Sequence, residues 1–281
     1  MQDITTIDWN EAWKTQSKDT KKKGGFLTCA DRWAEQERCR RMDAEVKASD
    51  WKVGRARISN MRLSPKSRVL DIGAGPGTLA VPLAGMVEHV TAVEPSGAML
   101  ECLRENIRAA GIDNIRIVRQ LWQDVDLYRD LEPPYDAVVA SFSLGFPDLL
   151  EALEKMNEAT NRYVYIFWFA DGMSPWHRNY GEIWEDLFGV PCSGRKPNIV
   201  FNLLNQMGIY PHVLISKEEH VSRFPGLEEA VATQADGLHL RDEEQVAVLR
   251  QYLAKKLQPD DGQYVMRGTS RRAMIWWEKE D

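Results

Sequence analysis

Long hydrophobic runs are missing from this sequence of 281 residues. The longest uninterrupted apolar run, Tyr163 to Ala170, is far too short to span a bilayer. The N-terminal residues show no basic region followed by an apolar one, so we expect no signal peptide, no membrane partner and a cytoplasmic location. Internal repeats and low-complexity segments are also absent, which excludes a repeat protein.

Cysteine is scarce as well. The four cysteines are widely spaced and contain no C-x-x-C pair. This pattern argues against a zinc site and against a disulfide framework, and it is typical of reduced thiols in a cytosolic protein. We therefore expect no metal site.

The content of apolar and charged residues is that of a folded protein with a core. Hydrophobic residues make up 43% of the chain, enough to bury a full core, and the net charge is −6. The segment Lys14–Arg68, called the basic N-terminal segment below, carries sixteen lysines and arginines against seven acids. Such a segment is either a solvated helical region or a surface that meets an anionic partner, and we favour the solvated region.

Short apolar strands alternate with helices through the middle of the chain. Strands without polar alternation, separated by helices, indicate a parallel sheet covered on both faces. The sequence therefore predicts an α/β fold with a doubly wound, mostly parallel, seven-stranded Rossmann-like sheet. Strands are expected at 68–72, 89–93, 115–119, 136–141, 163–169 and 210–216 and near the C-terminus, and helices at 78–87, 96–110, 147–160, 198–207, 227–235 and 242–257.

Domain boundaries follow from where this alternation starts and stops. Residues 1–62 are expected to form a helical N-terminal segment or lid, and residues 63–170 the ligand-binding core. Residues 171–200 are expected to be a lid insertion, and residues 201–281 to complete the core sheet around a helical insertion at 218–262. Insertions at the carboxyl ends of the strands would cover a ligand crevice.

A glycine-rich turn, VLDIGAGPGT at 69–78, joins the first strand to the first helix. Dinucleotide-binding turns need G-x-G-x-x-G, but the third glycine position here is Thr78. A phosphate-binding P-loop would need a lysine that is absent here, and Asp71 would repel a phosphate. Glu94 ends the second strand, where a carboxylate accepts hydrogen bonds from ribose hydroxyls. A turn without a phosphate signature and an acid for a ribose suit S-adenosylmethionine (SAM).

The sequence here resembles the class I SAM-dependent methyltransferases, in the broad group that acts mostly on small molecules. The matching segments are VLDIGAGPGT at 69–78, VEPSGAML at 93–100, NIRIVRQLWQDV at 114–125 and YDAVVASFSL at 135–144, in that order. The resemblance implies that SAM is the cofactor and S-adenosylhomocysteine (SAH) the product. The cofactor-binding residues that it implies are Asp71, Gly73, Ala74, Gly75, Glu94, Pro95, Met99, Leu121, Trp122, Gln123 and Ser141.

Two residues of that set, Trp122 and Ser141, each have two possible roles. Trp122 stacks on the adenine or fills a gap in the core. Ser141 lies near the methyl-transfer centre or bonds its own backbone. The resemblance assigns the methionine half of SAM to the glycine turn and the ribose to Glu94. It assigns the adenine to Pro95, to Met99 and to the loop at 121–124.

Methyl transfer needs no enzyme nucleophile, since the acceptor attacks the methyl carbon in line with the departing sulfur. His177, in the expected lid, is the candidate general base, although a lone loop histidine is more often a surface residue. Trp33, Trp176 and Tyr180 are candidates for the acceptor pocket. Tryptophans at helical spacing more often fill an ordinary core, and we favour that interpretation for Trp33, Trp176 and Trp184.

The favoured function is therefore methyl transfer from SAM to an unidentified small-molecule acceptor. One alternative is an RNA or protein methyltransferase that docks through the basic N-terminal segment, although a nucleic-acid partner is not expected at a pI of about 5.5. Another is a SAM-binding module without catalysis. The sequence leaves the acceptor and the oligomeric state open.

Overall fold

The computed structural model describes residues 7–22, 33–170, 179–190, 192, 198–240 and 242–279. Its α-helices are α1 Trp9–Lys22, α3 Gln36–Ala48, α4 Lys52–Ile58, α5 Ala80–Ala84, α6 Gly97–Ala110, α7 Leu127–Asp130, α8 Leu149–Ala159, α10 Trp184–Phe188, α11 Asn198–Gln206, α12 Leu227–Leu238 and α13 Glu243–Lys256, with 3-10 turns η2 Trp122–Asp124 and η3 Gly181–Ile183. Its strands are β1 Arg68–Ile72, β2 His89–Val93, β3 Ile115–Val118, β4 Tyr135–Ser141, β5 Thr160–Phe169, β6 His212–Phe224, β7 Gln258–Asp260 and β8 Gln263–Glu278. No helix in these ranges has both the length and the apolar character needed to cross a membrane.

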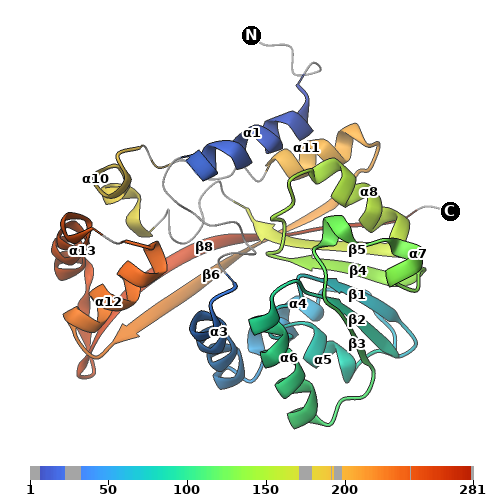
Figure 1. The fold of residues 1–281 in the computed structure, drawn as a ribbon, viewed down its shortest axis with the longest axis horizontal. Coiled ribbons are helices and arrows are strands. Elements are labelled where there is room, and N and C mark those ends of the chain that lie inside the picture. Colours follow the sequence, from blue (N-terminus) through green and yellow to red (C-terminus); the bar gives the residue numbers. More distant parts are fainter. Residues whose placement is uncertain are drawn as a thin grey trace.

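The sheet has the order β3-β2-β1-β4-β5-β8-β6 (Figure 1). The first five strands in the chain pair with their neighbours in parallel. Strand β8 runs antiparallel to both of its neighbours, β5 and β6. This confirms the predicted doubly wound, mostly parallel α/β fold. The seven expected strands lie on this path, and the short β7 adds an eighth by pairing with β8.

Two apolar layers cover the sheet. On one face the strands pack against α1, α8 and α11, and on the other against α4, α5 and α6. Alternate residues of each strand serve the two layers: Leu70 and Val138 belong to the first, and Val69 and Val139 to the second. The parallel strands are therefore buried on both faces, as their unbroken apolar sequences predict.

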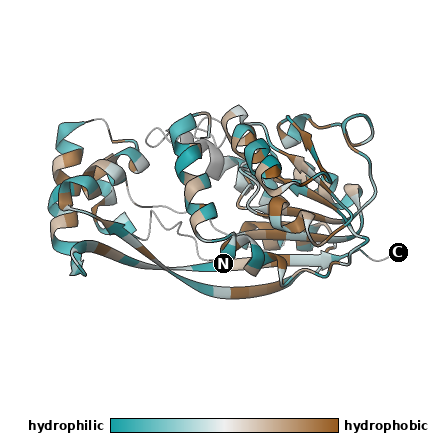
Figure 2. Cartoon of the chain, turned by 90° about the horizontal axis from the view of Figure 1, so that it is seen from below, coloured by the Kyte–Doolittle hydropathy of each residue, from teal (hydrophilic) through white to brown (hydrophobic). Residues whose placement is uncertain are grey.

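A second lobe stands beyond the main body. β6 and β8 pair from His212 opposite Trp276 to Phe224 opposite Tyr264, and these long strands reach out to α12 and α13 (Figures 1 and 2). α10, α12 and α13 share a separate apolar core. The sequence places the boundary of the helical insertion at 218, but the strand continues through that boundary to Phe224. The insertion is thus a helical pair at the end of a β-arm.

Local signals in the sequence place the first helices well. α6 begins after Ser96, whose side chain accepts a hydrogen bond from the Met99 backbone, and ends at Gly111 in the left-handed conformation. α5 starts only at Ala80, which puts Pro82 inside its first turn. The helix expected at 78–87 therefore starts two residues later, where the missing N–H of Pro82 costs no hydrogen bond within the helix.

The first helix, α1, supports the loop that follows β4. Trp13 of α1 is 1% exposed, and its indole N–H donates to the Phe146 carbonyl at 2.8 Å. Asn10 donates to Asp148 at 2.9 Å, and its own side-chain oxygen accepts from the backbone of Leu149. α1 therefore fixes the loop after β4 from the face of the sheet that also carries α8 and α11. That residues 1–62 or 171–200 act as a lid stays a prediction.

Candidate active site

The glycine turn docks on the end of β2. The backbone N–H groups of Gly73 and Ala74 both donate to the Val93 carbonyl, at 2.8 and 3.2 Å. Gly73 has φ +71°, and a Cβ there would lie 2.4 Å from the Cβ of Ser143. Glycine is required at this position because the loop after β4 packs directly on the turn.

Gly75, unlike Gly73, is not packed against other protein atoms on the side where a Cβ would point. Its φ is +58°, and a Cβ added there would meet no protein atom within 4 Å. The turn therefore exposes this stretch of backbone to open space instead of packing it against the protein. A bare backbone facing open space is what a ligand needs for a close approach.

Glu94 joins the glycine turn to the turn that follows β2, at the carboxyl edge of the sheet. Its Oε2 accepts from the Gly75 backbone N–H at 2.9 Å and its Oε1 from the Ser96 backbone N–H at 2.8 Å. The residue is only 6% exposed, and burial raises the pKa of its carboxyl group while the two N–H donors oppose that shift. A carboxylate offers about four acceptor positions, so this one can still accept from two hydroxyl groups.

Asp71 lies beneath the turn at the end of β1. The residue is 1% exposed, and the Ala80 backbone N–H stabilises its carboxylate. Among the described residues its Oδ2 has no hydrogen-bond partner, which is rare for a buried oxygen and fits a ligand donor. Burial and the nearby Glu94 raise the pKa of the Asp71 carboxyl group from 3.8 to about 7.

This shift predicts a pH dependence of stability. Between pH 3.8 and about 7 the folded protein holds a proton on Asp71 that the unfolded chain has lost, so the free energy of unfolding falls as pH rises through this window. Asp71→Asn should remove that part of the decline in the ligand-free protein. Urea unfolding of both proteins across this range measures it, with the exposed Asp113→Asn as the control. Parallel curves for wild type and Asp71→Asn would contradict the shift.

Helices α3 and α6 hold the turn from the side. Asn106 donates to the Pro76 carbonyl at 2.9 Å and to the Asp43 carboxylate at 2.6 Å, so one buried amide ties α3 and α6 to the turn. Ser96 donates its hydroxyl to the Trp33 carbonyl. The Trp33 side chain packs on the buried cluster that contains Met99. Trp33 thus stands at the predicted adenine side, whereas the sequence suggested the acceptor pocket.

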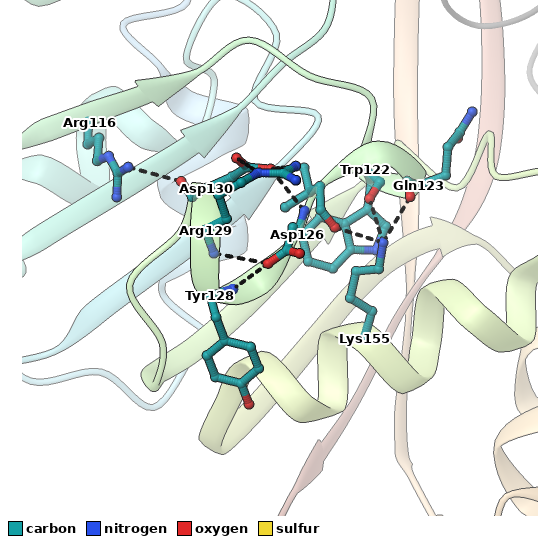
Figure 3. A network of polar contacts seen from close by, with 9 residues as sticks. Arg116, Trp122, Gln123, Asp126, Tyr128, Arg129, Asp130 and Lys155 are labelled. Carbon is teal, nitrogen blue, oxygen red and sulfur yellow. Dashed lines mark hydrogen bonds and ion pairs between the residues drawn. The ribbon is translucent and has the colours of Figure 1, made fainter.

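The loop at 121–125 is fixed by α8. The Lys155 ammonium donates to the carbonyls of Trp122, Gln123 and Val125 at 3.0 to 3.1 Å (Figure 3). The indole of Trp122 is 3% exposed, donates to the Ala152 carbonyl at 3.3 Å and belongs to the main core. The structure therefore favours the second interpretation of Trp122, in which its side chain fills the core.

Ser141 ends β4 beside the turn. Its hydroxyl accepts from Nη1 of Arg57 at 3.0 Å. Within the part of the chain that the structure describes, no bond from this hydroxyl to its own backbone is found. Two residues on, Ser143 donates to the Ile72 carbonyl at 2.6 Å and fixes the loop against β1. These bonds place Ser141 and Arg57 next to the glycine turn, on the side of β4.

Other predicted residues lie away from this site or outside the described ranges. Tyr180 is fully buried in the core of the second lobe and donates to Gln234 at 2.6 Å, which corrects its assignment to the acceptor pocket. Trp184 packs in the same core, as the alternative for the tryptophans expects. His177 and Trp176 fall outside the described residues. Pro95, Leu121 and Gln123 flank the site, Pro95 and Leu121 partly buried and Gln123 exposed.

Four residues of this region were missed from the sequence: Arg57, Asn106, Ser143 and Lys155. Each acts through a hydrogen bond to a residue distant in the chain, such as the 84 positions between Arg57 and Ser141. No local sequence motif predicts such contacts. A hint existed only for Asn106, a polar residue on the otherwise apolar face of α6.

A methyltransferase domain family matches residues 69–162. Over 78% of its length the chain is 27% identical to an uncharacterized protein of Haemophilus influenzae, of which the match covers 79%. Over 39% it is 35% identical to protein-L-isoaspartate O-methyltransferase 1 of Rhodopseudomonas palustris, and over 40% it is 31% identical to a 23S rRNA (uracil(1939)-C(5))-methyltransferase of Klebsiella pneumoniae. The chain spans 42% and 26% of these two enzymes.

Solved structures share the fold. A methyltransferase-type structure from Bacillus halodurans has a TM-score of 0.57 at 14% identity, covering 83% of this chain and 100% of that one. The YcgJ protein of Bacillus subtilis also has a TM-score of 0.57, at 12% identity, covering 81% of this chain and 98% of that one. The chain therefore carries a methyltransferase domain at 69–162, on a fold that it shares with these solved structures.

Proposed function

We propose that this protein transfers a methyl group from SAM to a small-molecule acceptor at the carboxyl edge of its sheet. The observation that carries the proposal is the arrangement of Glu94 and Gly75. The carboxylate of Glu94 is held by two backbone N–H groups with acceptor positions to spare, next to a turn whose middle glycine faces open space.

The residues around that arrangement fit the parts of SAM. Glu94 would accept hydrogen bonds from the ribose hydroxyls, and Met99 with Pro95 would lie beside the adenine. Gly73 to Gly75 would line the methionine half, where the partnerless oxygen of Asp71 would accept from its ammonium group. When bound, SAM supplies an electrophilic methyl group on a positively charged sulfur. The protein then has to align the acceptor and exclude water. His177 as a general base and the cytoplasmic location stay predictions.

An RNA or protein acceptor is the alternative, since curated relatives include enzymes with each kind of substrate. The structure offers little support for docking through the basic N-terminal segment, because many of its charges are paired within the protein. Arg38 and Arg41 each lie 3.6 Å from Asp236, and Lys47 lies 2.6 Å from Asp43. Paired charges contribute less to binding a polyanion, which favours the small-molecule proposal.

Calorimetric titration with SAH, with NAD as the control ligand, tests the proposed function. We expect saturable binding of SAH in the micromolar range and none of NAD. Binding of NAD alone would overturn the assignment of the glycine turn. Once an acceptor is known, the salt dependence of activity separates the two acceptor classes, because phosphate contacts make binding fall steeply with salt.

A further inference from the structure

Two arginines lie over one aromatic ring at the edge of the site. The guanidinium carbon of Arg57, from α4, is 4.7 Å from the centroid of the Phe142 ring, and that of Arg272, from β8, is 4.6 Å from the same centroid. Arg272 also lies 5.0 Å from the ring of Phe169 at the end of β5. Residues from α4, β4, β5 and β8 therefore converge here, on the side of the sheet away from Glu94.

The positive charge of this cluster is only partly compensated. Arg272 pairs with Glu218 at 3.0 Å, whereas Arg57 has no ion pair among the residues that the structure describes and donates to the neutral Ser141. Burial and, less strongly, the nearby Arg272 lower the pKa of Arg57 to about 10, although the charges of Glu218 and Asp71 oppose this shift. The two cations therefore repel each other in a poorly solvated place. An anion bound between them would relieve both costs.

Phe142 itself is held in an unusual conformation. Its φ is +56°, a left-handed backbone that bulky residues rarely adopt and that costs about 1–2 kcal/mol. Backbone strain of this kind gathers at ligand sites, where the surrounding contacts impose it. Here it turns the chain directly after Ser141, so that the aromatic ring meets both guanidinium groups.

We propose that Arg57 and Arg272 bind a carboxylate or phosphate group of the methyl acceptor, with Phe142 and Phe169 beside its apolar part. The acceptor is then a small organic anion. This inference rests on the proposed function, since it concerns the substrate of the same site. It follows from position: the cluster adjoins Ser141 on the β4 and β5 side of the turn, while the ribose acid Glu94 stands on the β2 side.

The carboxylate of the methionine half of SAM is the other source of such an anion. A pair of cofactor analogues distinguishes the two sources. SAH carries that carboxylate, and 5′-methylthioadenosine lacks the whole amino-acid end. If Arg57 binds the acceptor, Arg57→Met should leave the affinity for both analogues unchanged. If Arg57 binds the cofactor, the variant should lose affinity for SAH alone, and that result would overturn the proposal.

The direct test is calorimetric titration of the full chain with benzoate and with inorganic phosphate, with and without saturating SAH. We expect the wild type to bind at least one anion, Arg57→Met to bind it at least about tenfold more weakly, and Arg57→Lys to recover part of the loss. Arg62→Met is the matched control, because its guanidinium carbon also lies 4.7 Å from an aromatic centroid, that of Trp276, away from the cluster.

Each result of this titration is decisive. Equal anion binding by the wild type and Arg57→Met, or no anion binding by the wild type, overturns the proposal. Arg272→Met serves as a second variant, with circular dichroism to verify folding, since it leaves Glu218 without its arginine. Failure of the wild type to bind SAH would instead overturn the proposed function, and the titrations without SAH would still decide the arginine site.

Discussion

Glu94→Ala should weaken the binding of SAH by about 100-fold or more. In the proposed complex the variant would lose two charge-assisted hydrogen bonds to the ribose hydroxyls, each contributing roughly 1.5–3 kcal/mol, and about 1.4 kcal/mol corresponds to tenfold in affinity. It also releases the Gly75 and Ser96 backbone N–H groups from their common acceptor, which loosens the turn. Calorimetric titration with SAH measures the loss.

Two controls isolate the role of the ribose. Glu88→Ala removes an exposed acid at the other end of β2 and should leave the affinity for SAH unchanged. An SAH analogue without the two ribose hydroxyls should bind wild type weakly and should not distinguish wild type from Glu94→Ala. If SAH binds Glu94→Ala as well as wild type, Glu94 is not the ribose acid and the proposed site is misplaced.

Gly75→Val should nearly abolish SAH binding while the protein still folds. A side chain at this position meets no protein atom within 4 Å, so it fills the space that the ligand needs without displacing the core. The positive φ adds a strain of about 1–2 kcal/mol to the folded state. SAH titration and thermal unfolding of the same sample separate the loss of binding from the loss of stability.

Gly111→Val is the matched control for this substitution. Gly111 ends α6 with φ +63° and likewise has no atom within 4 Å of the added Cβ, so the strain is similar while the position is remote from the turn. It should lose comparable stability and bind SAH like wild type. Equal SAH binding by the two valine variants would show that the space at Gly75 is not the cofactor site.

Much of the core was predictable because its signals are local. The unbroken apolar strands, the Ser96 cap of α6 and the glycine turn each depend on residues within a few positions of one another, and β1, β2 and α6 lie where those patterns place them. Glu94 is likewise predictable, because the end of β2 must face the same crevice as the end of β1 in a parallel sheet.

The aromatic residues show the limit of this reasoning. Trp122 and Tyr180 have side chains that suit a ligand or a core equally, and only the packing of α8 on the loop at 121–125, and of the second lobe on itself, places both in cores. Spacing along the chain does not reveal which neighbours surround a tryptophan or a tyrosine, so their roles stay open until the tertiary contacts are known.

The sequence by itself determined the fold class, the glycine turn and the position of Glu94 at the end of β2, because hydrophobic periodicity and turn chemistry act over short stretches of chain. The tertiary structure alone decided that Arg57 and Arg272, 215 positions apart, lie over the same Phe142 ring. It also decided that β6 and β8 carry a separate helical lobe. Contacts of this range form only when the sheet brings distant segments together, and no local pattern encodes them.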